Sequence, residues 1–186
     1  MNRTVLDQER EYRAALLKAI QRCVFFLDGS IQKLTWPLQA ETIKERKQDI
    51  ELFESLAAIN ERFSKLQDTL GSAMRHAALL AGEPVDSFLK LLSFYEKCGV
   101  ISSIERWQLY RAVRNLAAHD YETDYAVIAE HFNALHELLP ALYEDAKIFL
   151  EYCRQTLKIV PEILDFESHF FTITGSLQSQ KVSGQE

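Results

Sequence analysis

The scarcity of residues that interrupt helices is the feature that most constrains this fold. The chain of 186 residues has only six glycines and four prolines, and no proline occurs between Leu38 and Ala81. Apolar residues recur through that stretch every three or four positions, which is the spacing of one face of an α-helix. The stretch is therefore expected to form one long helix, or two helices divided near Asn60 or Gly71.

The remainder of the chain has the same helical pattern, separated by short turn signals. Further helices are expected over residues 3–28, 87–97, from 102 to the segment around 119, and 124–157. Together they predict an all-α protein, an up-and-down bundle of about five helices spanning residues 1–160. Residues 161–186 are expected to form a C-terminal extension, with a polar, disordered end from Ser176 onward.

Local signals mark where several of these helices begin or end. Asp86 is a suitable cap for the helix that follows it. Ser102, with Glu105 three residues later, forms a capping-box pattern. Gly99 lies where a left-handed residue commonly ends a helix. Pro140 is expected to kink or divide the last helix, because proline lacks the N–H that an interior helical residue donates.

Charge and cysteine content limit the classes of function. The net charge of −6 argues against a generally basic nucleic-acid-binding surface, although it is compatible with a local basic cleft. Three cysteines without a Cys-x-x-Cys pair predict neither a disulfide framework nor a zinc site, and they favour a reducing cytoplasm. No apolar run approaches the ~20 residues needed to cross a bilayer, so no membrane span is expected. Neither a metal nor a cofactor is expected.

The segment richest in chemistry ends the helix that begins near residue 102. Residues 114–121 read Arg-Asn-Leu-Ala-Ala-His-Asp-Tyr. The guanidinium of Arg114 matches the geometry of phosphate oxygens, and His119 can transfer a proton near neutral pH. Asn115 could donate a hydrogen bond to the same phosphate or orient the histidine. These groups are the ones that RNA cleavage without a metal requires, because RNA supplies its own nucleophile in the 2′-hydroxyl.

A helical wheel at ~100° per residue divides this helix into two faces. The polar face is predicted to carry the site residues Arg111, Arg114, Asn115, His119 and Tyr121. The opposite, core-facing arc is predicted to carry Leu109, Val113, Leu116 and Ala117. Trp107 and Ile104 fall on the polar face, which suggests a partner surface. For Trp107, a place in the core or in a dimer interface is favoured over stacking on a base. Arg111 is an auxiliary residue, or else only covers the surface or pairs with an acid.

The order arginine, polar residue, three residues, histidine, one residue, tyrosine resembles the signature of the HEPN superfamily. The closest likeness is the HepT type, which occurs in toxin–antitoxin pairs with a minimal nucleotidyltransferase. The Gly99-Val100-Ile101 turn and the Glu105-Arg106-Trp107 run that precede the motif have the order usual in such proteins. The resemblance covers about residues 48–155.

This resemblance implies a HEPN-like homodimer whose two motifs face a shared cleft, and metal-independent endoribonuclease activity. Carried over to this chain, Arg114 and His119 would be catalytic and Asn115 auxiliary. Tyr121 would be the hydroxyl that the partner nucleotidyltransferase antitoxin modifies with AMP. Two other interpretations remain: a non-catalytic subunit that binds a nucleotidyltransferase, and a purely structural bundle in which the motif has decayed.

Overall fold

The computed structural model describes residues 5–83, 86–116, 124–161 and 163–182. Within these ranges the chain is built from helices and connecting turns and contains no strand, so the all-α prediction is confirmed. The elements are α1 (Val5–Ile31), α2 (Ala40–Glu45), α3 (Ile50–Leu80), α4 (Phe88–Lys97), α5 (Ile104–Leu116), α6 (Tyr125–Tyr152), a π-helical turn (Cys153–Leu157) and α7 (Glu167–Val182).

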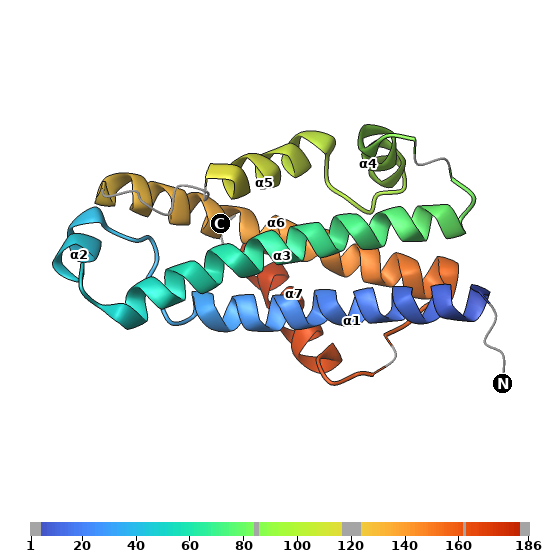
Figure 1. The fold of residues 1–186 in the computed structure, drawn as a ribbon, viewed down its shortest axis with the longest axis horizontal. Coiled ribbons are helices and arrows are strands. Elements are labelled where there is room, and N and C mark those ends of the chain that lie inside the picture. The colour runs from blue at the N-terminus through green and yellow to red at the C-terminus, as the bar shows by residue number, and fades with distance from the viewer. Residues whose placement is uncertain (1–4, 84–85, 117–123, 162, 183–186) are drawn as a thin grey trace.

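Four helices, α1, α3, α5 and α6, lie roughly along one long axis and alternate in direction along the chain (Figure 1). Helices α1 and α3 pack against each other over most of their length, and α5 packs on both α3 and α6. Helix α7 crosses the bundle, where it contacts α1 and α6. Among the described residues, no helix is both long enough and apolar enough to cross a membrane.

The core lies where the apolar faces of α1, α3 and α6 meet. Each of these helices presents apolar residues at spacings of three and four, so one face of each is removed from water. The buried side chains include Leu17, Ile20, Val24 and Leu27 of α1, Ile59, Phe63, Leu66 and Leu70 of α3, and Leu135, Leu142, Ala146 and Phe149 of α6. Burying a side chain of this size contributes about 1.5–3 kcal/mol, so this seam is the main source of stability.

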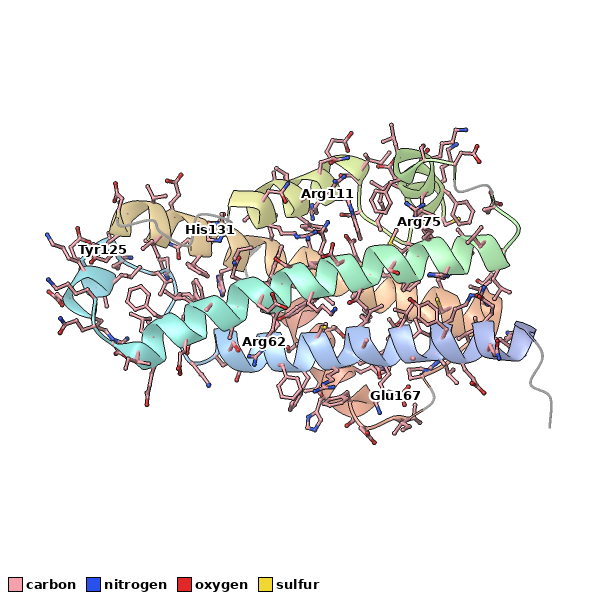
Figure 2. All side chains as sticks on the ribbon, viewed as in Figure 1. Arg62, Arg75, Arg111, Tyr125, His131 and Glu167 are labelled. Atoms are coloured by element: carbon pink, nitrogen blue, oxygen red, sulfur yellow. The ribbon has the colours of Figure 1, made fainter. Side chains whose placement is uncertain are left out.

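Two arginines connect α1 and α3 near opposite ends of the pair. Nε of Arg13 in α1 donates a hydrogen bond to the carbonyl oxygen of His76 in α3, at 3.2 Å. Nη1 of Arg62 in α3 donates one to the carbonyl oxygen of Phe26 in α1, at 3.0 Å (Figure 2). Each arginine thus reaches a main-chain oxygen toward the C-terminal end of the other helix, which suits a cation there.

The proline-free stretch divides into two helices, but not at either predicted place. Asn60 and Gly71 both lie within α3. The break occurs before Asp49, whose Oδ1 accepts a hydrogen bond from the backbone N of Leu52 at 3.0 Å and so caps α3. Arg46 donates from Nη2 to Oδ2 of the same carboxylate at 2.6 Å. The capping carboxylate therefore starts the new helix without any glycine or proline.

Other helix ends differ from the predictions by one residue. Ser87, rather than Asp86, caps α4, since its Oγ accepts from the backbone N of Lys90 at 3.2 Å. Asp86 forms an ion pair with the Lys90 ammonium instead, at 3.0 Å. At α5, Ser103 rather than Ser102 accepts from a first-turn N–H. Gly99 has a φ of 68°, so the prediction of a left-handed residue after α4 is confirmed.

The C-terminal part of the chain is more helical than the sequence suggested. Pro140 lies inside α6 without dividing it. Helix α7 continues to Val182, past Ser176, where a disordered end was predicted. Residues 183–186 lie outside the described part of the chain.

Candidate functional site

Helix α5, which carries the first residues of the motif, Arg114–Leu116, is anchored to α6 by a buried carboxyl. Asp145 of α6 accepts a hydrogen bond from the backbone N of Ser102 at 3.1 Å and another from the hydroxyl of Tyr110 at 3.0 Å. Burial raises the pKa of Asp145 to about 6, although both hydrogen bonds act in the opposite direction. Burial, followed by the neighbouring Asp145, also raises the pKa of Tyr110. One side chain thus fixes both the start and the middle of the motif helix.

The buried face of α5 is not the face that the helical wheel predicted. Trp107 and Tyr110 are almost fully buried, whereas Leu109 keeps 53% of its surface exposed. Trp107 packs into the seam where Gly71 of α3 has no side chain, since a Cβ at Gly71 would lie 3.4 Å from its ring. The prediction that Leu109 faces the core is therefore wrong. Of the two places favoured for Trp107, the core and a dimer interface, the structure shows the core. Two large aromatic rings bury more area than one leucine, and they decide the orientation of the helix.

Ile104 also packs against the core, so the partner surface predicted for Ile104 and Trp107 is absent. Val113 is half-buried and packs against the core as well. The core arc predicted for α5 is thus only partly correct. The side chains of Leu116 and Ala117 lie outside the described part of the structure, so their predicted place in the core is not tested.

Arg114 lies one turn beyond Tyr110 on the same side of α5, so it points toward α3 rather than into open solvent. Its Nη1 forms an ion pair with Oδ1 of Asp68 at 2.5 Å and contacts Oε1 of Gln67 at 3.4 Å. The Arg114 side chain keeps 32% of its surface exposed and Asp68 keeps 55%. Gln67 is buried. The guanidinium therefore lies at the surface between α5 and α3 and is directed toward Asp68 and Gln67.

Of the other predicted site residues, the structure describes Arg111 and Asn115 but not His119 and Tyr121. Arg111 and Asn115 are exposed on α5, where Figure 2 labels Arg111. The predicted polar face therefore contains these two residues, while Arg114 lies beside the core face. His119 and Tyr121 lie outside the described residues, so the structure does not test their placement.

Sequence reasoning missed Asp68 and Gln67 as partners of the motif. Asp68 is 46 positions away from Arg114 in the chain, and α3 reads as an ordinary amphipathic helix around it. No local signal identifies a carboxylate as the partner of one particular arginine. The pairing follows only from the orientation of α5, which the aromatic residues determine.

The chemistry available at this surface is that of an oriented guanidinium beside a carboxylate. Such a half-exposed ion pair stabilises a protein by about 0–1 kcal/mol, so an anion can displace Asp68 at modest cost. The described residues contain no group of three or more His, Cys, Asp or Glu side chains arranged to hold a metal ion. The fixed positive charge of Arg114 is thus the feature of the site that could bind a phosphate.

Two other histidines, His131 and His136, lie on α6. Both ring nitrogens of His131 are buried and have no hydrogen-bond partner among the described residues, and burial lowers the pKa of this histidine. His136 stacks on Trp36 with ring centroids 4.4 Å apart, and burial lowers its pKa too. Neutral, packed imidazoles fit the interpretation of these histidines as structural residues.

Comparison with known proteins identifies no relative of this chain. No family model, no curated protein and no solved structure matches it. The resemblance to the HEPN superfamily therefore rests on residues 99–121 and their helical setting alone.

Proposed function

We propose that this chain is a HEPN/HepT-like toxin, a metal-independent endoribonuclease that acts as a homodimer. Arg114 binds and neutralises the scissile phosphate, and His119 transfers protons. Asn115 and Arg111 are auxiliary groups at the same end of α5. A minimal nucleotidyltransferase antitoxin silences the site by placing AMP on Tyr121, which adds negative charge where the RNA phosphate would bind.

The observation that carries this proposal is the state of Arg114. It lies in the last turn of α5, immediately before the stretch that contains His119, and its Nη1 is fixed by Asp68 and Gln67. The two contacts direct the Arg114 guanidinium toward α3, and its planar fork matches the geometry of phosphate oxygens. Its partial exposure leaves the guanidinium accessible to an RNA strand at the surface.

The proposed reaction is an attack by the RNA on itself. The 2′-oxygen forms a bond to phosphorus while the bond from phosphorus to the 5′-oxygen breaks, which leaves a 2′,3′-cyclic phosphate and a 5′-hydroxyl. A neutral His119 accepts the 2′-hydroxyl proton, and a protonated His119 from the second protomer protonates the leaving 5′-oxygen. Arg114 stabilises the extra negative charge on the phosphoryl oxygens in the transition state.

Asp68 has a definite role in this scheme. It orients Arg114 in the free protein, and the RNA phosphate displaces it during binding. The acidic partner weakens RNA binding, but it also disfavours binding of Arg114 to unrelated weak anions.

The test is cleavage of a mixed RNA pool in EDTA by purified wild-type protein, with fragments analysed for a terminal cyclic phosphate. We expect cleavage by wild type, a loss of at least about 100-fold in His119→Ala and a comparable loss in Arg114→Gln. His76→Ala is the matched control, because His76 is a half-buried histidine of α3 outside the motif. Circular dichroism verifies that all variants are folded.

The same experiment separates this function from the non-catalytic alternative. If wild-type protein shown by intact mass to carry no AMP leaves the RNA pool uncut, the ribonuclease proposal is overturned. Binding of a minimal nucleotidyltransferase by that inactive protein, lost in Tyr121→Phe, would then assign the chain as a nucleotidyltransferase-binding subunit.

A further inference from the structure

A second surface feature lies between the C-terminal turns of α1, helix α3 and helix α7, and it shares no residue with the Arg114–Asp68 pair. It is a hollow of about 420 Å³ formed by the C-terminal turns of α1, by Arg62 of α3 and by His169 and Ile173 of α7. We refer to it as the α1–α3–α7 hollow. Its volume is within the range of about 300–1,000 Å³ that is typical of small-molecule sites. The proposed ribonuclease chemistry does not use any of its residues.

One wall of the α1–α3–α7 hollow is aromatic. The Phe25 ring lies 5.2 Å from that of Phe26 and 5.0 Å from the imidazole of His169, measured between centroids. Phe166, at the start of the α7 region, packs behind both phenylalanines at 5.5 and 6.0 Å. Phe26 keeps 39% of its surface exposed. The wall thus offers ring faces and edges to a planar apolar group.

Arg62 supplies a fixed cation at the edge of this wall. Its Nη1 donates to the carbonyl oxygen of Phe26 and to the hydroxyl of Ser30. Its guanidinium lies 5.6 Å from the centroid of the Phe26 ring. Both of these hydrogen bonds use Nη1, so the edge formed by Nε and Nη2 has no protein acceptor among the described residues. That edge is the two-donor fork that binds carboxylates and phosphates.

The remaining charges of the hollow favour an anion near Arg62. Lys33 is exposed and forms no ion pair in the described part of the structure. Asp28 is the one carboxyl group among the described lining residues, and its Oδ2 accepts from Nε2 of Gln32 at 2.5 Å. Burial raises the pKa of the Asp28 carboxyl, although its hydrogen bond with Gln32 acts in the opposite direction. Two cations thus face a single, partly buried carboxyl.

We propose that the α1–α3–α7 hollow binds a small planar aromatic molecule that carries one carboxylate or phosphate group. The ring packs on Phe25, Phe26 and the imidazole of His169. The anion accepts two hydrogen bonds from Nε and Nη2 of Arg62 and lies within reach of Lys33. The shared chemistry is an aromatic ring with an anion one or two bonds away.

An NMR titration of the full-length chain tests this binding with two probes, indole-3-acetate for the carboxylate and 1-naphthyl phosphate for the phosphate. Indole is the uncharged control. We expect at least one of the two anions to bind with a Kd below about 1 mM. Binding by one anion alone identifies the acidic group that the hollow takes. Failure of both anions at about 5 mM, or equally tight binding of indole, would overturn the proposal.

Arg62→Gln and Arg22→Gln form a matched pair of variants. Both guanidinium groups lie 5.6 Å from the Phe26 ring centroid, but only Arg62 lines the hollow. We expect Arg62→Gln to weaken anion binding at least about tenfold and Arg22→Gln to change it less than about twofold. Equal effects of the two substitutions would show that Arg62 holds no ligand.

A filling variant keeps the test valid if Arg62→Gln proves unstable. Gly29 lines the hollow, and a Cβ built there meets no atom within 4 Å. Gly29→Leu should therefore fold and block the site, abolishing probe binding. Gly175→Leu is its control, because a Cβ at Gly175 in α7 also meets open space while Gly175 does not line the hollow. Retained binding in a folded Gly29→Leu protein would contradict this location of the site.

Discussion

Helices α3 and α5 both carry apolar residues at helical spacing, yet the sequence predicts the buried face of one and not of the other. In α3, the positions Leu56, Phe63, Leu66 and Leu70 read as apolar and are all buried. In α5, Leu109 reads as a core residue and is more than half exposed. The extent of packing explains the difference. Helix α3 contacts α1, α4, α5 and α6, so its wide apolar stripe has one low-energy orientation.

Helix α5 is shorter, makes smaller contacts with its neighbours α3, α4 and α6, and has an apolar residue on nearly every face. Its orientation is determined by which large side chains fit the surface below, and Gly71 provides the space that Trp107 occupies. Its second constraint is polar, the carboxyl of Asp145. A periodic pattern therefore predicts a buried face well for a helix that packs extensively, and poorly for a helix held by two aromatic rings and one acid.

The largest expected effect comes from applying the same substitution to both helices. Leu70→Ala in α3 should lower the free energy of unfolding by about 2–5 kcal/mol, because it leaves a cavity in the core. Leu109→Ala in α5 should change it by less than about 0.5 kcal/mol, because that side chain is mostly in solvent. Urea denaturation measures both. Similar losses in the two variants would show that Leu109 is covered in solution.

The next effect concerns pH and the carboxyl that anchors α5. The pKa of Asp145 in the fold, about 6, lies above its ordinary value of 3.8, so the folded state holds this proton more tightly than the unfolded state does. The resulting stabilisation is fully present below about pH 4 and is lost as pH rises through about 6.

Asp145→Asn should remove this pH dependence, because the neutral amide can accept from Ser102 N and hydrogen-bond with Tyr110. Between pH 4 and 7, wild type should lose roughly 2–3 kcal/mol relative to Asp145→Asn, as measured by denaturation at each pH. Parallel stability curves for the two proteins would mean that Asp145 is not buried as a raised-pKa acid.

The smallest effect concerns the ion pair between the two helices. Asp68→Asn should change stability by less than about 1 kcal/mol, since Asp68 is more than half exposed. The same substitution should strengthen RNA binding about fivefold, because the phosphate no longer displaces a carboxylate from Arg114. Fluorescence anisotropy with a labelled single-stranded RNA measures the change. Glu54→Gln, on α3 about four turns earlier, is the control. Weaker RNA binding by Asp68→Asn would contradict the displacement step.

The fold was predictable in outline because helix formation depends on local sequence. Carboxylates before apolar runs identify helix starts, and Asp124 caps α6 through a hydrogen bond to the backbone N of Ala126. The position of the break between α2 and α3 was not predictable, because several polar residues in this stretch look as suitable as Asp49 to cap the next helix. The turn at Gly99 was predictable, since the backbone there requires a positive φ.

The candidate site was predictable only in part, for a different physical reason. The position of Arg114 in the last turn of α5 follows from periodicity. Its contact with Asp68 does not, because that contact depends on how two helices are rotated against each other. The roles of His119 and Tyr121 remain predictions from the motif.

The two arginines that connect α1 and α3 also make this helix pair resistant to shear. Sliding α1 along α3 by one helical turn, about 5.4 Å, would break the Arg13 and Arg62 contacts simultaneously, because they lie near opposite ends of the pair. Apolar side chains tolerate such a displacement more readily, since neighbouring turns present similar surfaces. The hydrogen bonds of Arg13 and Arg62 therefore oppose sliding of α1 along α3 at both ends of the helix pair.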